Sequence, residues 1–259
     1  MNDMWLRYTH LDKLYGHLPG LNEALPAIFG LTRTEYDEII GRFDESARAA
    51  AEDLLADEAF AAALDGLPFR AGQTVLAVGD SNTDDLQSWA EILRHLLAPR
   101  GVQVVNGGLS AHTTAMVLRR WPGTLTALRP DWVICGLGGN DVTRVGRDAA
   151  KTQVSLGESV ANLRELRRLA PGTDWVWLTP VPVVEERVAA TPAFAYGQST
   201  WRNDDVVALA KEVSTFPEPV VDLTAVFGVP ADPELQGPDG VHVTMAGQVA
   251  IVKALVQLL

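Results

Sequence analysis

From Thr74 to the C-terminus, short apolar runs alternate with longer amphipathic stretches. The runs have the length of buried strands, and in the longer stretches the apolar residues recur at helical spacing. This alternation predicts a parallel sheet with helices on both faces. The predicted strands are 74–78, 102–105, 132–137, 175–179 and 220–223, and the predicted helices lie near 84–98, 112–128, 152–170, 200–214 and 244–258.

Residues 1–72 differ in character and predict a helical extension. Thr32 and Glu35 have the spacing of a capping box, and apolar residues mark one face of the helix that follows. No catalytic constellation is recognisable in this part. We therefore predict a helical N-terminal extension of residues 1–72 and a main domain of residues 73–259. The extension packs on the main domain, covers its active site or forms a subunit contact.

Composition narrows the function classes. With 259 residues, of which 47% are hydrophobic, the chain can bury a sizeable core. Its net charge of −12 argues against nucleic acid or an anionic membrane as the main partner, because both would repel it. No apolar run has the length of a membrane span, and no signal peptide is recognisable, so we expect a cytoplasmic protein. The single cysteine, Cys135, excludes an internal disulfide and fits a small buried core residue.

Polar residues follow three of the predicted strands at the point where each strand ends. Asp80 and Ser81 follow the first strand, residues 106–108 the second and residues 138–141 the third. In open parallel sheets, ligands bind outside the carboxyl ends of the strands. The sequence therefore predicts a site at this edge of the sheet.

Ser81 is the candidate nucleophile at this edge. Gly79 permits a tight turn after the first strand, and a helix begins within a few residues. The serine hydroxyl is thereby raised to the sheet edge beside a helix N-terminus. This is the physical logic of a nucleophile elbow, although the pattern G-x-S-x-G is absent. A simple helix N-cap is the alternative interpretation.

A nucleophilic serine needs a base and a group that orients the base. Of the five histidines, His242 is the best candidate, since it lies in a turn-rich loop before the last predicted helix. Asp239 stands three residues earlier, so a turn can bring its carboxylate to the imidazole. His112 follows the second strand and is a second candidate, whereas His95 lies among leucines and fits a structural role. An ordinary surface contact is the alternative for the Asp–His pair.

An oxyanion needs hydrogen-bond donors. Gly108 offers a backbone N–H with no side chain to obstruct approach, and Asn140 offers a side-chain amide after the third strand. Ordinary turn chemistry is the alternative for both, because glycine and asparagine cluster in loops for conformational reasons.

Four ordered blocks combine these candidates, at residues 79–81, 106–108, 138–141 and 239–242. Their order and spacing resemble those of the SGNH, or GDSL-type, hydrolase family, and the resemblance covers about residues 73–259. It implies a three-layer α/β/α sandwich with a five-stranded parallel sheet. Members of this family are mostly esterases, lipases, thioesterases and carbohydrate deacetylases, with some acyltransferases.

The resemblance also implies a role for each candidate residue. Ser81 is similar to the family nucleophile, whose own N–H also donates to the oxyanion. Gly108 and Asn140 are similar to the two other oxyanion donors. His242 resembles the base, and Asp239 resembles the acid that orients it.

Two features depart from the family pattern. Ala111 stands where the second block often has a further glycine, which loosens the match of that loop. The nucleophile block normally lies near the start of the domain, whereas here the long extension precedes it. Substrate preference therefore does not transfer simply from the family.

Four further residues are candidate substrate contacts. Arg144 can hold a carboxylate or phosphate, with a surface ion pair as the alternative. Phe194, Tyr196 and Trp201 lie in the long connection after the fourth strand and can line an acyl pocket, with core packing as the alternative. Neither the ligand spacing of a metal site nor a glycine-rich phosphate loop occurs, so we expect no metal and no cofactor.

These observations predict a metal-free serine hydrolase that forms an acyl-enzyme on Ser81. Its substrate would be a small-molecule carboxylic ester, thioester or O-acetyl compound. An acyltransferase with an alcohol acceptor and a non-catalytic binding module with the same pocket are the alternatives.

Overall fold

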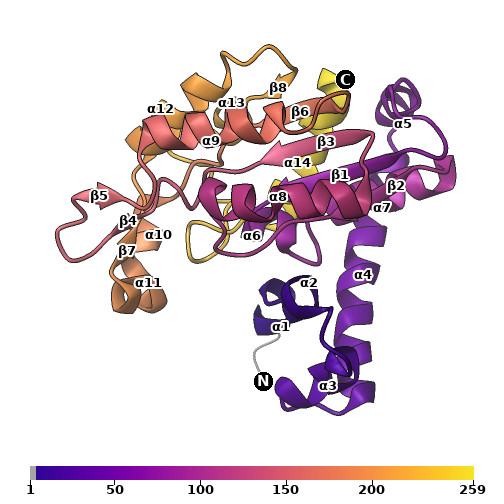
Figure 1. Cartoon of the computed structure of the whole chain (residues 1–259), viewed down its shortest axis with the longest axis horizontal. Coiled ribbons are helices and arrows are strands. Elements are labelled where there is room, and N and C mark those ends of the chain that lie inside the picture. The colour runs from indigo at the N-terminus through magenta and orange to yellow at the C-terminus, as the bar shows by residue number, and fades with distance from the viewer. Residues whose placement is uncertain (1–3) are drawn as a thin grey trace.

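A central sheet of five parallel strands organises the chain in a computed structural model, which describes residues 4–259 (Figure 1). The strands are β1 (Thr74–Gly79), β2 (Gln103–Asn106), β3 (Trp132–Gly136), β6 (Asp174–Leu178) and β8 (Val220–Val221). Their order in the sheet is β2-β1-β3-β6-β8. β1 lies between β2 and β3, with Ala77 opposite Asn106 and Gly79 opposite Gly136, so the loops after these three strands begin side by side.

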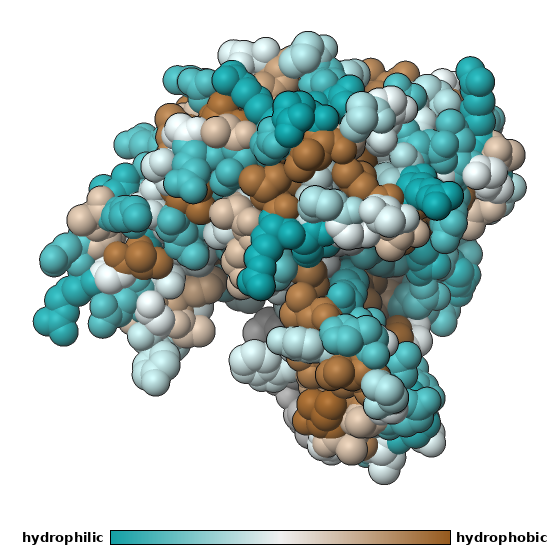
Figure 2. Space-filling model, viewed as in Figure 1, coloured by the Kyte–Doolittle hydropathy of each residue, from teal (hydrophilic) through white to brown (hydrophobic). Residues whose placement is uncertain are grey.

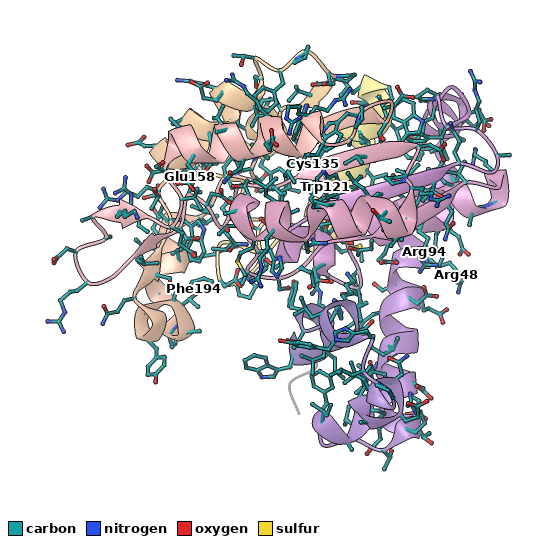
Figure 3. All side chains as sticks on the ribbon, in the orientation of Figure 1. Arg48, Arg94, Trp121, Cys135, Glu158 and Phe194 are labelled. Carbon is teal, nitrogen blue, oxygen red and sulfur yellow. The ribbon has the colours of Figure 1, made fainter. Side chains whose placement is uncertain are left out.

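Helices cover both faces of the sheet, which confirms the predicted three-layer sandwich (Figure 1). Because side chains alternate along a strand, Val75 and Ala77 of β1 pack in one core, and Leu76 and Val78 pack in the other. Cys135 is buried in the second core, as expected, and Figure 3 labels it together with Trp121 of that core. The first core receives α4 (Arg33–Leu55), α5 (Glu58–Asp65), α7 (Trp89–Leu97), α13 (Leu223–Phe227) and α14 (Met245–Leu258), and the second receives α8 (Thr114–Leu128), α9 (Leu156–Arg168) and α12 (Asn203–Val213).

The last strand is shorter than the alternation predicts. β8 ends at Val221, whereas the predicted strand continues through Asp222 to Leu223. Asp222 ends the strand because its side chain accepts the N–H of Thr224 at 2.9 Å and so caps α13. A capping carboxylate therefore converts the end of an apolar run into the first turn of a helix.

An arm that the sequence pattern does not predict extends beside the main sheet at the left of Figure 1. It contains a small antiparallel sheet with the strand order β5-β4-β7, and two short helices lie directly before β7 in the chain. We call these elements together the arm. They are β4 (Arg144–Val145), β5 (Lys151–Thr152), α10 (Glu185–Ala190), α11 (Pro192–Gly197) and β7 (Ser199–Thr200).

The N-terminal part is helical, as predicted. Thr32 and Glu35 form the expected capping box at the start of α4. The second half of α4 packs on α7 through buried residues that include Ala47 and Leu54, and its first half extends away from the sheet (Figure 1). The extension thus packs on the main domain, while a boundary at residue 72 stays a prediction. Before α4 lie α1 (Met4–Tyr8), α2 (Leu11–Tyr15) and α3 (Leu21–Ile28).

Among the described helices, none combines the length and the apolar character that crossing a membrane requires.

Candidate active site

Ser81 lies at a tight turn between β1 and the short helix α6 (Ser81–Asp84), where the strand–turn–helix pattern places it. The side chain of Asp80 caps α6 by accepting a backbone N–H of its first turn. Gly79 is required before this turn, because a Cβ there would lie 2.0 Å from the side chain of Thr83. The turn therefore fixes the position of the Ser81 hydroxyl at the carboxyl end of β1.

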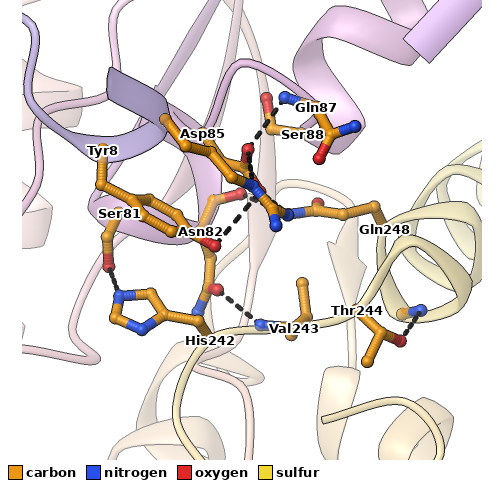
Figure 4. A network of polar contacts seen from close by, with 12 residues as sticks. Tyr8, Ser81, Asn82, Asp85, Gln87, Ser88, His242, Val243, Thr244 and Gln248 are labelled. Atoms are coloured by element: carbon orange, nitrogen blue, oxygen red, sulfur yellow. Dashed lines mark hydrogen bonds and ion pairs between the residues drawn. The ribbon is translucent and has the colours of Figure 1, made fainter. Parts of the chain in front are cut away.

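A chain of hydrogen bonds joins Ser81 to His242 and Asp239, and Figure 4 shows its Ser81–His242 link. Nε2 of His242 lies 2.9 Å from Oγ of Ser81, although 161 residues separate the two in sequence. Nδ1 of the same ring lies 2.6 Å from Oδ2 of Asp239. The other carboxylate oxygen accepts the backbone N–H groups of Val241 and His242 at 2.9 and 3.0 Å. The three residue types that the sequence singled out therefore meet in the order that proton transfer from serine requires.

The Asp239 carboxyl remains ionised in this arrangement. Burial alone would raise its pKa, but the hydrogen bond and charge of His242 and the two backbone N–H groups hold the pKa below its usual value. An ionised Asp239 accepts a hydrogen bond from the N–H at Nδ1 of His242, which leaves the unprotonated Nε2 free to accept the Ser81 hydroxyl proton. This tautomer is the one that a general base needs.

Asn82, directly after the nucleophile, holds the loop of His242 in place (Figure 4). Its side-chain oxygen accepts the N–H of Val243 at 3.1 Å, and its amide donates to the carbonyl of Val241 at 3.4 Å. Gln248 in turn donates to the Asn82 carbonyl at 3.1 Å and accepts the N–H of Trp89 at 2.8 Å. Sequence reasoning missed Asn82, although an amide beside a nucleophile is a visible signal.

Asp80 is structural. It is 7% exposed, and burial raises the pKa of its carboxyl to about 6 despite the hydrogen bond from the N–H of Asn82. Its Oδ2 packs so closely on Gly139 that a Cβ at that glycine would lie 2.8 Å away. The orienting carboxylate of the histidine is thus Asp239, and Asp80 serves the turn.

The prediction that Gly108 donates to an oxyanion is wrong in this structure. Its N–H already donates to the side-chain oxygen of Asn106 at 3.0 Å. The residue packs against the backbone of α6, where an added Cβ would lie 2.5 Å from the nitrogen of Asp84. Gly108 is therefore a glycine because of close packing behind Ser81, and its N–H is engaged within the protein.

Ala111 takes the place that Gly108 was expected to fill. It lines the cavity in front of Ser81 together with Asn140, and its backbone is in the left-handed region at φ 63°. Among the described residues its N–H has no hydrogen-bond acceptor. The Asn140 amide uses one of its two hydrogens on the carbonyl of His112 at 3.2 Å, which leaves the second for a ligand. His112 contributes this carbonyl, and its ring does not hydrogen-bond Ser81.

Tyr8 of α1 packs against His242, a contact that no sequence pattern indicates. The two ring centroids are 4.7 Å apart and the planes are tilted by 36°. The preceding residue, Arg7, pairs with both carboxylate oxygens of Asp85 at 2.6 Å. The extension, which carries no recognisable motif, therefore reaches His242.

A cavity of about 590 Å³ opens in front of the Ser81 hydroxyl. Four aromatic side chains, from the extension and from the region of the arm, contribute to its walls. The residues that line it are Trp5, Tyr8, Thr9, Ser81, Ser110, Ala111, Asn140, Thr143, Gln153, Thr191, Ala193, Phe194, Ser199, Trp201, Asp239, Val241 and His242.

Two of the four predicted substrate contacts line this cavity and two do not. Phe194 and Trp201 are in its wall, with ring centroids 4.8 Å apart. Tyr196 is 94% exposed on α11 and lies outside the cavity lining, so its predicted contact is wrong. Arg144 is also misassigned, because it is bound to Asp205 through two hydrogen bonds of 2.6 and 2.8 Å beside a different cavity. It is the ion pair that the sequence left as its alternative.

This arrangement has the groups that acyl transfer requires. His242 can accept the proton of the Ser81 hydroxyl while Asp239 orients its ring, and Asn140 and Ala111 offer donors across the same cavity. Within residues 4–259, no three His, Cys, Asp or Glu side chains form a group that could hold a metal ion.

Comparison with known sequences supports the same chemistry. A sequence model of the GDSL-like Lipase/Acylhydrolase family matches residues 77–250. The chain is 38% identical to Esterase TesA of Pseudomonas aeruginosa over 101 residues, which are 36% of this chain and only half of that esterase. It is 26% identical to an acetylxylan esterase of Geobacillus stearothermophilus over 214 residues, which cover 72% of this chain and 93% of that protein.

Comparison with solved structures agrees on the fold. The structure of LAE5, an alpha/beta hydrolase enzyme from the metagenome of Lake Arreo in Spain, superposes with a TM-score of 0.57. The superposition covers 73% of this chain and 96% of that one, at 24% sequence identity. At this identity the likeness is one of fold.

Proposed function

The chain belongs to the GDSL-like lipase/acylhydrolase family, and from this membership we propose that it is a serine hydrolase that cleaves a carboxylic ester through an acyl-enzyme on Ser81. The observation that carries the proposal is the continuous hydrogen-bonded chain from Ser81 through His242 to Asp239, open to a cavity of substrate size. Membership in the family supports an enzyme that hydrolyses esters, and the site geometry supports the choice of residues.

In the acylation half-reaction, Oγ of Ser81 attacks the ester carbonyl while Nε2 of His242 accepts the hydroxyl proton. Asp239 stabilises the resulting imidazolium by its charge and its hydrogen bond to Nδ1. When the tetrahedral intermediate collapses, the C–O bond to the alcohol breaks and the imidazolium gives its proton to the leaving oxygen. The acyl group is then an ester of Ser81.

The oxyanion of the tetrahedral intermediate needs donors that are not otherwise engaged. We assign the backbone N–H groups of Ser81 and Ala111 and the side-chain amide of Asn140. The cavity lining supports this set, since the three residues surround one space and Gly108 has its N–H engaged elsewhere. Each such donor contributes on the order of 3 kcal/mol of transition-state stabilisation.

Deacylation uses the same groups in reverse roles. Water enters the place that the alcohol has left, His242 takes one of its protons, and hydroxide attacks the acyl carbon. When the second tetrahedral intermediate collapses, the bond from the acyl carbon to Oγ of Ser81 breaks and the imidazolium returns its proton to Oγ, which releases a carboxylic acid and restores the serine. An alcohol in place of this water would give acyl transfer instead.

A single experiment tests the proposal. The purified protein is incubated with a fluorophosphonate probe and separately with p-nitrophenyl acetate, with Ser81→Ala as the control. Covalent labelling and ester turnover that both disappear in the variant support the proposal. Wild-type turnover in folded Ser81→Ala would overturn it, and product analysis with added alcohols separates hydrolysis from acyl transfer.

A further inference from the structure

The first turns of the chain form one wall of the catalytic cavity, although the family match begins only at residue 77. Trp5, Tyr8 and Thr9 line the cavity together with Ser81 and His242. We call residues 5–13 the N-terminal segment. Its contribution to the site is a property of this chain beyond the part that the family model describes.

A buried ion pair holds one end of the N-terminal segment in place. The guanidinium of Arg7 donates to both oxygens of the Asp85 carboxylate at 2.6 Å, and that carboxylate is fully buried. Loss of Arg7 would leave a buried charge without its partner, which is costly in a folded protein. Tyr8 follows directly, so its ring is held against His242 by a strong neighbouring contact.

A second buried carboxylate holds the other end. Oδ1 of Asp84 lies 2.6 Å from Nδ1 of His10 and 2.6 Å from Nζ of Lys13, and the side chain of Asp84 is 1% exposed. Lys13 also donates to the carbonyl of Gly108 at 3.1 Å, in the loop that leads to Ala111. Asp84 and Asp85, which follow Ser81 closely in the chain, therefore each bind the N-terminal segment. These contacts fix the position of the segment beside the cavity.

The surface that the segment presents is aromatic. Trp5 lines the cavity while 70% of its surface stays exposed to solvent, so its indole is accessible to a ligand. Across the cavity lie Phe194 and Trp201, which pack on each other. Figure 2 shows the surface hollowed between the N-terminal helices and the arm, and Figure 3 shows Phe194 on the arm side.

Size and charge define what this cavity can hold. Its volume of about 590 Å³ lies within the range of pockets for drug-sized ligands, far more than an acetyl group fills. Among residues 4–259, those that line the cavity carry no ionisable side chain apart from Asp239, His242 and the tyrosine, and none of them is a lysine or arginine. The cavity therefore favours a neutral, apolar group over an anionic one.

We propose that this cavity selects esters that carry a bulky apolar group, aromatic or medium-chain aliphatic, and that Trp5 and Tyr8 of the N-terminal segment set this preference. The inference rests on the ester hydrolysis proposed above. The apolar group lies on the acyl side or on the alcohol side of the ester. In both cases the same apolar surface fills the cavity. Tyr8 also packs on the base, so it acts both as a wall and as a positioning residue.

Two series of ester substrates test the apolar preference and show whether the apolar group lies on the acyl or on the alcohol side of the ester. One holds p-nitrophenol constant and lengthens the acyl group from acetate through butyrate to hexanoate. The other holds acetate constant and changes the alcohol from ethanol to hexanol and benzyl alcohol, with a peracetylated pyranoside as a polar acetate. We expect kcat/KM to rise in one series by up to about fourfold for each methylene that leaves water.

Two variants and a matched control tie the preference to the N-terminal segment. Trp5→Ala and Tyr8→Ala should each lower the ratio of kcat/KM for the best apolar ester to that for the acetate about threefold or more. The ratio cancels any effect on catalytic steps that the two substrates share. Tyr196→Ala removes an even more exposed aromatic that lies outside the cavity, and should leave the ratio unchanged.

Fluorophosphonate labelling of Ser81 in every variant separates the two proposals. If Ser81 is labelled and acetate is hydrolysed, but both series are flat or the pyranoside is the best substrate, the apolar preference is overturned and the hydrolase stands. An unchanged ratio in Trp5→Ala and Tyr8→Ala overturns the role of the segment. Absence of both labelling and turnover in the wild type overturns the hydrolase itself.

Discussion

The side-chain oxygen of Asn82 accepts the N–H of Val243 in a hydrogen bond of 3.1 Å, which joins the residue after the nucleophile to the residue after the base. Ser81 and His242 are thus tied through their chain neighbours as well as through their own contact. Because both ties act over an interval of 161 residues, they must form when the last loop docks on the sheet edge.

Asn82→Ala should lower kcat about tenfold to a hundredfold, because a small displacement of the base is enough to impair proton transfer. Steady-state kinetics with p-nitrophenyl acetate measures the effect. Asn22→Ala, an exposed asparagine remote from the site, is the control and should have wild-type kinetics. Full activity in Asn82→Ala would show that the Ser81–His242 contact needs no support from this amide.

Asp239→Asn should lower kcat by on the order of 10⁴ with little change in the fold. An asparagine amide facing Nδ1 of His242 favours the wrong tautomer, in which Nε2 carries the proton and cannot accept one from Ser81. Circular dichroism checks the fold and kinetics checks the rate. An activity loss of less than about tenfold would point to another acid for the histidine.

Asn140→Ala should lower kcat by about 10² to 10³ while KM changes little, because an oxyanion donor acts mainly on the transition state. The measurement is the full dependence of rate on substrate concentration. Asn162→Ala serves as the control, since that amide donates to Thr114 in the core. An effect confined to KM would assign Asn140 to ground-state binding.

The different environments of Ala111 and Gly108 give a pair of predictions. Ala111→Gly keeps the N–H and relieves a left-handed backbone, so it should retain activity and gain up to about 1 kcal/mol of stability. Gly108→Ala should destabilise the protein by about 1–3 kcal/mol, because its Cβ would meet the backbone of α6 at 2.5 Å. Urea denaturation compares the two. A tolerated Gly108→Ala would contradict the packing described here.

Burial of Asp80 predicts a pH dependence of stability. Its folded pKa of about 6 lies above its ordinary value of 3.8, so between these values the folded protein holds a proton that the unfolded chain has released. Stability is therefore lost as the pH rises through this window. Asp80→Asn removes this pH dependence. The free energy of unfolding of the variant minus that of the wild type should therefore rise by up to about 3 kcal/mol from about pH 4 to about pH 7. Urea denaturation at both pH values measures it, and a constant difference would contradict the raised pKa.

The sheet and the hydrogen-bonded chain of Ser81, His242 and Asp239 were predictable because their signals are local. Apolar runs predicted the ends of four strands within one residue, and the fifth strand is two residues shorter because Asp222 caps a helix. Ser81, Asp239 and His242 each sit in a short block whose turn residues show in the sequence. The rule that sites lie at the carboxyl ends of strands then brought the blocks together.

The oxyanion donor and the aromatic wall depend on contacts that no local pattern encodes. The sequence suggested that the N–H of Gly108 is free, but this N–H donates to the side chain of Asn106. The backbone of Ala111, three residues later, adopts a left-handed conformation beside the cavity instead. Tyr8 contacts His242 because the neighbouring Arg7 forms an ion pair with Asp85, a residue 78 positions later in the chain. Arg144 and Tyr196 were residue types suited to binding, and only their partners and exposure reveal that they do not line the cavity.

The anchoring of the N-terminal segment by Asp84 and Asp85 has a consequence for when the enzyme becomes active. The reactive serine receives its wall from the beginning of the chain and its base from the loop before the last helix. A folding intermediate with a formed sheet but undocked ends would hold the nucleophile without either. Ester turnover is therefore a built-in reporter of complete folding, and during refolding it should appear after the signals of secondary structure.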